Sequence, residues 1–212
     1  MSTFIAQRNE LFSARLIENL LRRHIHAVYC PTVADAVTHV SSLIADGSSV
    51  SWGGSMTVRD MRLPEVLAAR GTLRLLDRDK VEGADVRRTY LEAMDADVYL
   101  TSANALSEDG IIVNIDGNGN RVAAITWGPK RVIHIIGMNK VAHTLDAAIA
   151  RARGTAAPIN AQRLNINTPC KHDGRCHDCN AADSICSYIH LLRNSRDEQR
   201  HVVVLVGETL GF

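Results

Sequence analysis

The sequence lacks an excess of charge of either sign. Lysine and arginine together number 24, aspartate and glutamate number 23, and the formal net charge is +1 over 212 residues. Proteins that bind DNA or RNA need a surface of concentrated positive charge to neutralise phosphates. The balance of charges therefore argues against a nucleic-acid partner.

Long apolar runs are also missing. No stretch reaches the roughly 18 apolar residues that a membrane-spanning helix requires. The opening residues, MSTFIAQRNELFSARLIENLL, have neither the uninterrupted apolar core nor the small-residue cleavage site of an export signal. We therefore expect a cytoplasmic protein with no membrane partner. In a reducing cytosol, clustered cysteines bind metal more often than they form disulfides.

The chain has no internal repeat and no low-complexity segment, and we expect residues 1–212 to form a single domain. Short apolar strands alternate with amphipathic helices, which predicts an α/β fold with a mostly parallel sheet and helices on both faces. The turn GNGN between two β-rich runs predicts an inserted β-hairpin at residues 111–127. The other expected strands are 26–31, 48–54, 72–77, 96–106, 131–137 and 201–212.

Four of the five cysteines fall in the segment PCKHDGRCHDCNAADSIC. Cys170, Cys176, Cys179 and Cys186 follow the pattern C-x5-C-x2-C-x6-C. Thiolates are soft ligands for zinc and iron–sulfur clusters, and this close spacing is more typical of a cubane-binding loop than of a zinc ribbon. We expect a metal-binding loop at residues 165–190 that holds a [4Fe–4S] cluster, with structural zinc or metal-free thiols as alternatives.

A glycine-rich turn, SWGGSMT, follows an expected strand and precedes an expected helix. Gly53 and Gly54 let backbone N–H groups approach an anion, and Ser55 and Thr57 add hydroxyl donors. The N-terminus of the helix would favour the same anion. The pattern predicts a site for a small anionic metabolite, and a plain strand-to-helix turn is the alternative.

The most distinctive part of the chain is TSANALSEDGIIVNIDGNGNRVAAITWGPKRVIHIIGMNKV, residues 101–141. Together with SWGGSMT and the cysteine segment, it resembles the LUD-domain family, named for lactate utilisation. The resemblance covers essentially the whole chain. Within that family the sequence resembles a short, stand-alone branch with a cysteine loop, rather than the lactate-utilisation protein C subunit.

This resemblance implies the α/β fold shared by sugar-phosphate isomerases, CoA transferases and 5-formyltetrahydrofolate cyclo-ligase. In that fold the first glycine-rich turn commonly holds phosphate or carboxylate, and SWGGSMT occupies the matching place. The SEDG turn is similar in position to segments with catalytic carboxylates, which implies catalytic roles for Glu108 and Asp109. We expect this pair and Asn104 to face the glycine turn across one cleft. An ordinary Asp-Gly turn is the alternative.

Two lysines follow glycines near expected strand ends, where α/β folds gather ligands. Either Lys130 or Lys140 could bind an anionic substrate, and ordinary surface lysines are the alternative. His134 alternates with apolar neighbours and is expected in the core. Tyr90 and Trp127 are expected to be packing residues.

The resemblance implies a metabolic role in the oxidation of lactate or a related 2-hydroxy acid, with an iron–sulfur electron-transfer protein as partner. No G-x-G-x-x-G fingerprint follows a strand, so the chain alone is not expected to transfer a hydride. One alternative is an enzyme acting on an acyl-CoA, a sugar phosphate or a folate derivative. The other is a non-catalytic metal-binding or redox-sensing module. The sequence leaves catalysis and oligomeric state open.

Overall fold

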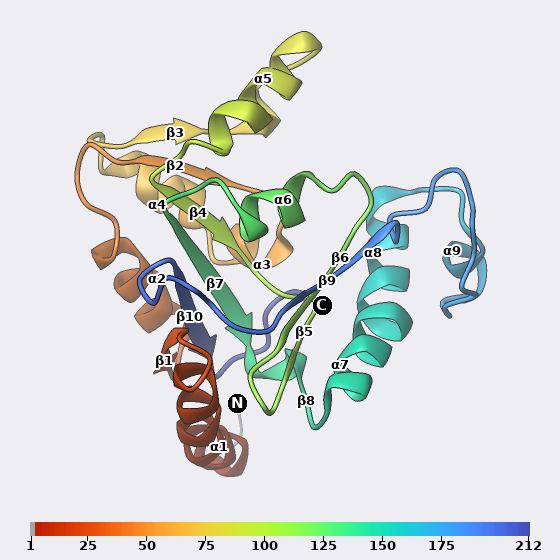
Figure 1. The fold of residues 1–212 in the computed structure, drawn as a ribbon, viewed down its shortest axis with the longest axis horizontal. Coiled ribbons are helices and arrows are strands. Elements are labelled where there is room, and N and C mark those ends of the chain that lie inside the picture. Colours follow the sequence, from red (N-terminus) through yellow and green to blue (C-terminus); the bar gives the residue numbers. More distant parts are fainter. Residues whose placement is uncertain (1–2) are drawn as a thin grey trace.

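A computed structural model describes residues 3–212, and these residues form two sheets (Figure 1). The larger sheet has the strand order β1-β10-β7-β4-β2-β3, and every neighbouring pair is parallel. The expected α/β fold with a mostly parallel sheet is therefore confirmed. The strands are His26–Cys30 (β1), Ser49–Trp52 (β2), Arg74–Leu76 (β3), Val98–Thr101 (β4), Arg131–Gly137 (β7) and His201–Val206 (β10).

Helices cover both faces of the larger sheet because successive strand residues point to opposite sides. Ile133 and Ile135 of β7 pack in one cluster with α2, α3 and α4, whereas Ile136 packs in another with α1. His134, between them, is fully buried as expected. The helices of this part are Thr3–Leu21 (α1), Val33–Ser42 (α2), Met56–Asp60 (α3), Leu63–Ala69 (α4) and Ala84–Ala93 (α5).

A smaller sheet, with the order β8-β5-β6-β9, lies against the larger one. Leu106 and Ile112 pack with α1 and the larger sheet, and Val113 and Ile115 face a long helical stretch on the other side. The strands are Ala105–Ser107 (β5), Ile112–Asp116 (β6), Val141–Ala142 (β8) and Tyr188–Leu192 (β9). The helical stretch joins Leu145–Arg151 (α7), a π-helical turn at Ala152–Ala156 and Ala157–Leu164 (α8).

The hairpin expected at residues 111–127 is wrong in its second arm, because Asn120–Thr126 form a helix (α6). Asp116 Oδ1 accepts hydrogen bonds from the backbone N–H groups of Asn118 (3.0 Å) and Gly119 (2.8 Å), which turns the chain away from the sheet. Gly119 adopts a positive φ of 81°, which favours glycine. The hairpin that forms instead pairs β5 with β6.

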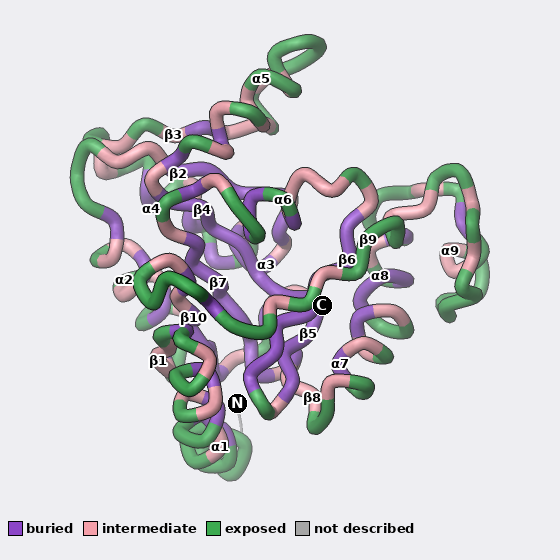
Figure 2. Tube along the Cα trace, viewed as in Figure 1, coloured by how far each residue is buried: buried purple, intermediate pink, exposed green. Residues whose placement is uncertain are grey.

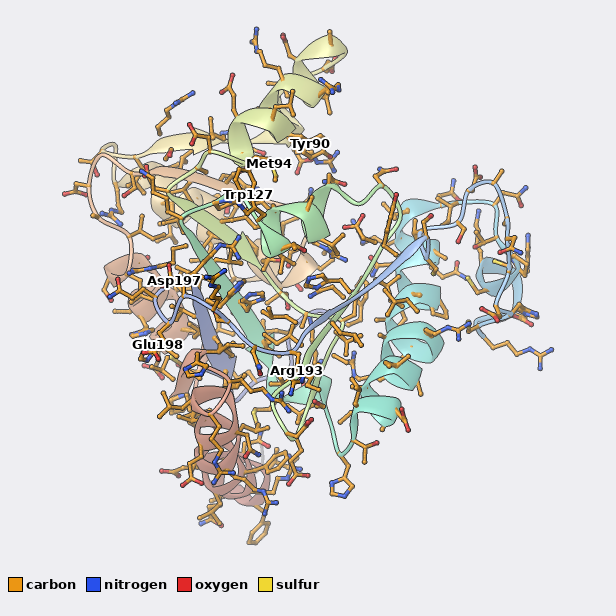
Figure 3. All side chains as sticks on the ribbon, in the orientation of Figure 1. Tyr90, Met94, Trp127, Arg193, Asp197 and Glu198 are labelled. Carbon is orange, nitrogen blue, oxygen red and sulfur yellow. The ribbon has the colours of Figure 1, made fainter. Side chains whose placement is uncertain are left out.

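Trp127, expected to be a packing residue, is 76% exposed (Figure 3), and it is the next residue, Gly128, that packs against Met94. Trp127 follows the last residue of α6 in an extended conformation, which directs the chain away from the apolar side of that helix. Tyr90 is half-buried, and its ring faces the guanidinium of Arg78 at 6.0 Å.

The cysteine segment begins with a short helix, Pro169–Asp173 (α9), and continues without a helix or strand to Ser187. Figure 2 shows that most of this segment is exposed, unlike the two sheets. Two short 3-10 helices, Arg78–Lys80 (η1) and Met138–Lys140 (η2), complete the described elements. No described helix combines the length and the apolar character needed to span a bilayer.

Candidate functional site

A cavity of about 480 Å³ opens where the larger sheet meets the smaller one. Its wall comes from the β2–α3 turn, the β4–β5 connection, the β6–α6 turn, η2 and the end of α8. The turns after β2 and β4 leave the carboxyl ends of parallel strands, which is where open α/β sheets bind ligands. The cavity is therefore the candidate functional site.

The glycine turn contributes part of this wall, as the sequence led us to expect. Gly54, Ser55 and Thr57 line the cavity. Ser55 begins α3 by accepting a hydrogen bond from the backbone N–H of Val58 at 3.4 Å. Gly53 lies just behind, where a Cβ atom would come within 2.9 Å of the Tyr99 hydroxyl, so a larger residue does not fit.

Lys140 is the buried cation of the cavity, with 2% of its surface exposed. Its Nζ donates hydrogen bonds to Thr57 Oγ1 at 2.9 Å and to Ser102 Oγ at 3.0 Å. No carboxylate of residues 3–212 forms an ion pair with this amine. Burial first, and then the charges of Arg151 and Arg121, lower the pKa of Lys140 to about 7. At neutral pH the amine can therefore accept or release a proton.

Arginines add further positive charge. Arg121 Nε lies 3.4 Å from Asp116 Oδ2, and one of its terminal nitrogens lies 3.4 Å from Asn104 Oδ1. Its Nε is buried and makes no hydrogen bond with any described residue. Asp116 and Asn104 therefore hold Arg121 at the cavity wall.

Arg78 and Arg163 line the more exposed part of the cavity. Arg78 Nε lies 3.0 Å from Asp79, and Arg163 Nε donates a hydrogen bond to Asn160 Oδ1 at 3.0 Å. Partial burial, followed by the positive charges of Arg59, Arg121 and Arg78, lowers the pKa of Arg163. These guanidinium groups repel one another, so a bound anion would relieve an unfavourable interaction.

Asn104 lines the cavity at the start of β5, where its side-chain oxygen accepts a hydrogen bond from the backbone N–H of Ile115 at 2.8 Å. Glu108 and Asp109 do not line it, so the cleft expected to unite them with the glycine turn does not form. Four residues of extended chain separate Asn104 from Glu108 by about 13 Å, which carries the acidic pair past the opposite end of β5. Asp109 pairs there with Arg23, two residues past the end of α1, at 2.6 Å.

Glu108 contacts Arg15 of α1 at 3.1 Å and His143 at 2.6 Å. These contacts join the β5–β6 turn to α1 and to the start of α7. Lys130 is also distant from the cavity lining and forms an ion pair with Asp97 at 2.7 Å. This pairing gives Lys130 a surface role in the structure.

The four cysteines are free thiols, and in residues 3–212 no three cysteine, histidine, aspartate or glutamate side chains are arranged to hold a metal ion. Burial, followed by the charges of Cys176, Cys170 and Cys179, raises the pKa of Cys186. Cys186 therefore lies within electrostatic range of the other three thiols. As soft donors the four thiols fit an iron–sulfur cluster or zinc in their chemistry, and their exposed segment would have to close around the metal.

The cysteine segment is also a wall of the cavity. Residues 182–185, just before Cys186, line it. A Cβ atom added to Gly117 would lie 3.0 Å from the Cα of Ile185, so the β6–α6 turn and the cysteine segment touch closely. Ser184 Oγ accepts a hydrogen bond from the backbone N–H of Cys186 at 3.2 Å. A change in the position of the cysteines would therefore also move residues that line the cavity.

Sequence reasoning missed the arginines of this site. Arg121 directly follows the GNGN turn, and recognising a helix start there would have drawn attention to it. Arg78 and Arg163 lie in no motif and are far apart in the chain, and only the packing of η1 and α8 brings them to one cavity.

Comparison with known proteins supports the family resemblance. The family model of the LUD domain matches residues 13–206. Among solved structures, a DUF162 family protein from Deinococcus radiodurans is similar, with a TM-score of 0.54 and 12% identity; the match covers 93% of this chain and 98% of that one. This likeness concerns the fold alone.

A second solved structure, the translation initiation factor eIF-2B of Pyrococcus horikoshii OT3, matches with a TM-score of 0.39 and 17% identity. That match covers 53% of this chain and 48% of that one, and it supports no further conclusion. A search of curated proteins found no match.

Proposed function

The chain belongs to the LUD-domain family, and from that premise we propose that it binds lactate or a related 2-hydroxy acid in the basic cavity and takes part in its oxidation. The partner in this proposal is an iron–sulfur electron-transfer protein, and the setting is the cytoplasm. The observation that carries the proposal is the buried amine of Lys140, which faces the cavity without a carboxylate partner among the described residues.

The lining of the cavity suits a small carboxylate. Arginine binds carboxylates through two parallel hydrogen bonds, and Arg121 lines the cavity with an Nε that forms an ion pair with Asp116 but no hydrogen bond with the described residues. Thr57 and Ser102 hold the Lys140 amine in position, and because Thr57 donates its hydroxyl proton to Ser102, the Ser102 hydroxyl can donate to an anion. The lining of the cavity is more polar than apolar, so recognition would rest mainly on charge and hydrogen bonds.

Oxidation of a 2-hydroxy acid to a 2-oxo acid removes two protons and two electrons. With a pKa of about 7, neutral Lys140 can accept the hydroxyl proton. The electrons require a separate acceptor, because the sequence carries no nucleotide-binding glycine fingerprint in the required context. In the proposal the iron–sulfur partner takes the two electrons in two one-electron steps, and the second proton, from C2, is released to water.

Cys170, Cys176, Cys179 and Cys186 are the residues that would hold a metal centre of this chain. A [4Fe–4S] cluster there would supply one-electron transfer, and zinc would supply folding energy only. Because residues 182–185 line the cavity, this centre would adjoin the bound acid.

The test is lactate-dependent dye reduction by protein purified and reconstituted without oxygen, with and without candidate iron–sulfur partner subunits. Lactate binding is measured separately by isothermal titration calorimetry. The Lys140→Met variant should lose the activity, whereas Lys130→Met, which removes a lysine outside the cavity, should keep it. Absence of both binding and activity with every partner would show the proposal to be wrong.

A further inference from the structure

The cavity carries more positive charge than one carboxylate group requires. Its lining contains four cationic side chains, Arg78, Arg121, Lys140 and Arg163, against two carboxylates, Asp116 and Asp183. Both carboxylates are already engaged. Asp116 accepts from the N–H groups of its own turn and pairs with Arg121 at 3.4 Å, and Asp183 accepts from the backbone N–H of Asn167 at 3.1 Å.

The cations form an inner and an outer group. The inner group is Lys140, buried between Thr57 and Ser102. The outer group is Arg78 and Arg163, which are less buried. Arg121 is near both groups, because its charge lowers the pKa of Lys140 and also that of Arg163.

We infer that the ligand of this cavity carries two anionic groups, one bound by the inner group and one by the outer group. The inference rests on the proposed function and narrows its substrate class to a 2-hydroxy acid that bears a phosphate or a second carboxylate. Two features of the described residues carry it. Lys140 and Arg163 form no ion pair with a carboxylate of residues 3–212, whereas Arg121 pairs with Asp116 and Arg78 with Asp79. The guanidinium of Arg163 matches the geometry of phosphate or carboxylate oxygens.

The size of the cavity agrees with this ligand class. Sites of about 300–1,000 Å³ usually hold ligands well above the size of a three-carbon acid, and this one measures about 480 Å³. A ligand with a single carboxylate would leave one cationic group facing solvent without a counter-charge. Such a site would forgo most of its electrostatic attraction.

The test compares three probes by isothermal titration calorimetry at fixed pH and ionic strength: lactate, malate and 3-phosphoglycerate. Malate and 3-phosphoglycerate should bind at least about tenfold more tightly than lactate, because a second charge-assisted contact forms. Arg163→Met should weaken binding of the two dianionic probes by about fivefold or more and leave lactate within about twofold.

Arg87→Met is the matched control, because Arg87 is exposed on α5 and does not line the cavity. It should change none of the three affinities. Equal affinity for lactate and the dianions, or an equal loss for all three probes in Arg163→Met, would overturn the inference and leave the proposed function standing. If none of the three acids binds, the proposed function fails as well.

Discussion

Replacing Lys140 by methionine should stabilise the folded protein at neutral pH. The unfolded chain keeps the Lys140 proton up to its ordinary pKa of 10.5, whereas in the folded protein the pKa of Lys140 is lowered to about 7. At any pH below 10.5, folding therefore requires the amine either to lose its proton or to be buried in its charged form, and both cost free energy. The resulting penalty is present in full below pH 7 and disappears as the pH rises through 10.5.

The size of the penalty follows from this shift. It amounts to about 4 kcal/mol at pH 7 and falls to about 1 kcal/mol at pH 9.5. Methionine has a similar unbranched stem and no charge. The two hydroxyl groups that lose the amine remain partners of each other, since Thr57 Oγ1 lies 3.2 Å from Ser102 Oγ. The substitution should therefore recover most of the penalty.

Urea unfolding of the wild-type protein and the Lys140→Met variant at pH 7 and at pH 9.5 measures this effect. The advantage of the variant should shrink by about 3 kcal/mol between the two pH values. The other titrating groups contribute equally to the pH dependence of both proteins, so their contributions cancel in the difference between the two free energies of unfolding. Lys130→Met is the control, because the ion pair with Asp97 raises the pKa of Lys130 and its effect should not change over this range. An advantage that is absent at pH 7, or equal at both pH values, would refute the reasoning.

Three further predictions concern other parts of the chain. Burial first, and then neighbouring positive charge, lowers the pKa of His201 to about 4. Between pH 7.5 and pH 5 the free energy of unfolding of the wild-type protein should therefore fall by about 2 kcal/mol more than that of the His201→Phe variant. An identical fall for both proteins in urea unfolding would contradict this. Cys179→Ser should abolish metal retention in anaerobically purified protein, measured by metal analysis. The urea midpoint of the core should stay unchanged, because the sheets bury their own apolar residues. Unchanged metal content would count against the cysteine site. In Gly117→Ala the added Cβ would lie 3.0 Å from the Cα of Ile185 and should displace the cysteine segment. The variant should therefore bind 3-phosphoglycerate more weakly, and its Cys186 should be alkylated faster. Alkylation at the wild-type rate would show that the cysteine segment does not pack on this turn.

The sequence by itself determined the features that depend on neighbouring residues. Short apolar runs marked the strands of the larger sheet, and these form parallel pairs as expected. The strand expected at 96–106 divides instead into β4 of the larger sheet and β5 of the smaller one. The glycine turn was located correctly as a strand-to-helix connection because its hydroxyl and glycine residues are contiguous. The clustering of four cysteines was likewise visible in the chain, and their metal stays a prediction.

Local patterns failed where two structures suit the same residues. RVAAITW can form a strand or a helix, and its apolar residues became helical because they pack on Tyr99 and Val132 of the larger sheet. The position of the acidic pair Glu108–Asp109 relative to the cavity could not be predicted from local patterns either. Which end of β5 faces the cavity depends on how the smaller sheet docks, and this cannot be read from the SEDG turn itself.

Only the tertiary structure decided the composition of the cavity. Lys140 becomes a buried amine because η2 places it against Thr57 and Ser102, which lie 83 and 38 residues earlier in the chain. Arg78, Arg121 and Arg163 line one cavity because the starts of η1 and α6 and the end of α8 come together there. Secondary structure follows from the spacing of neighbouring side chains, whereas the desolvation and mutual repulsion that define this site arise only when distant segments pack together.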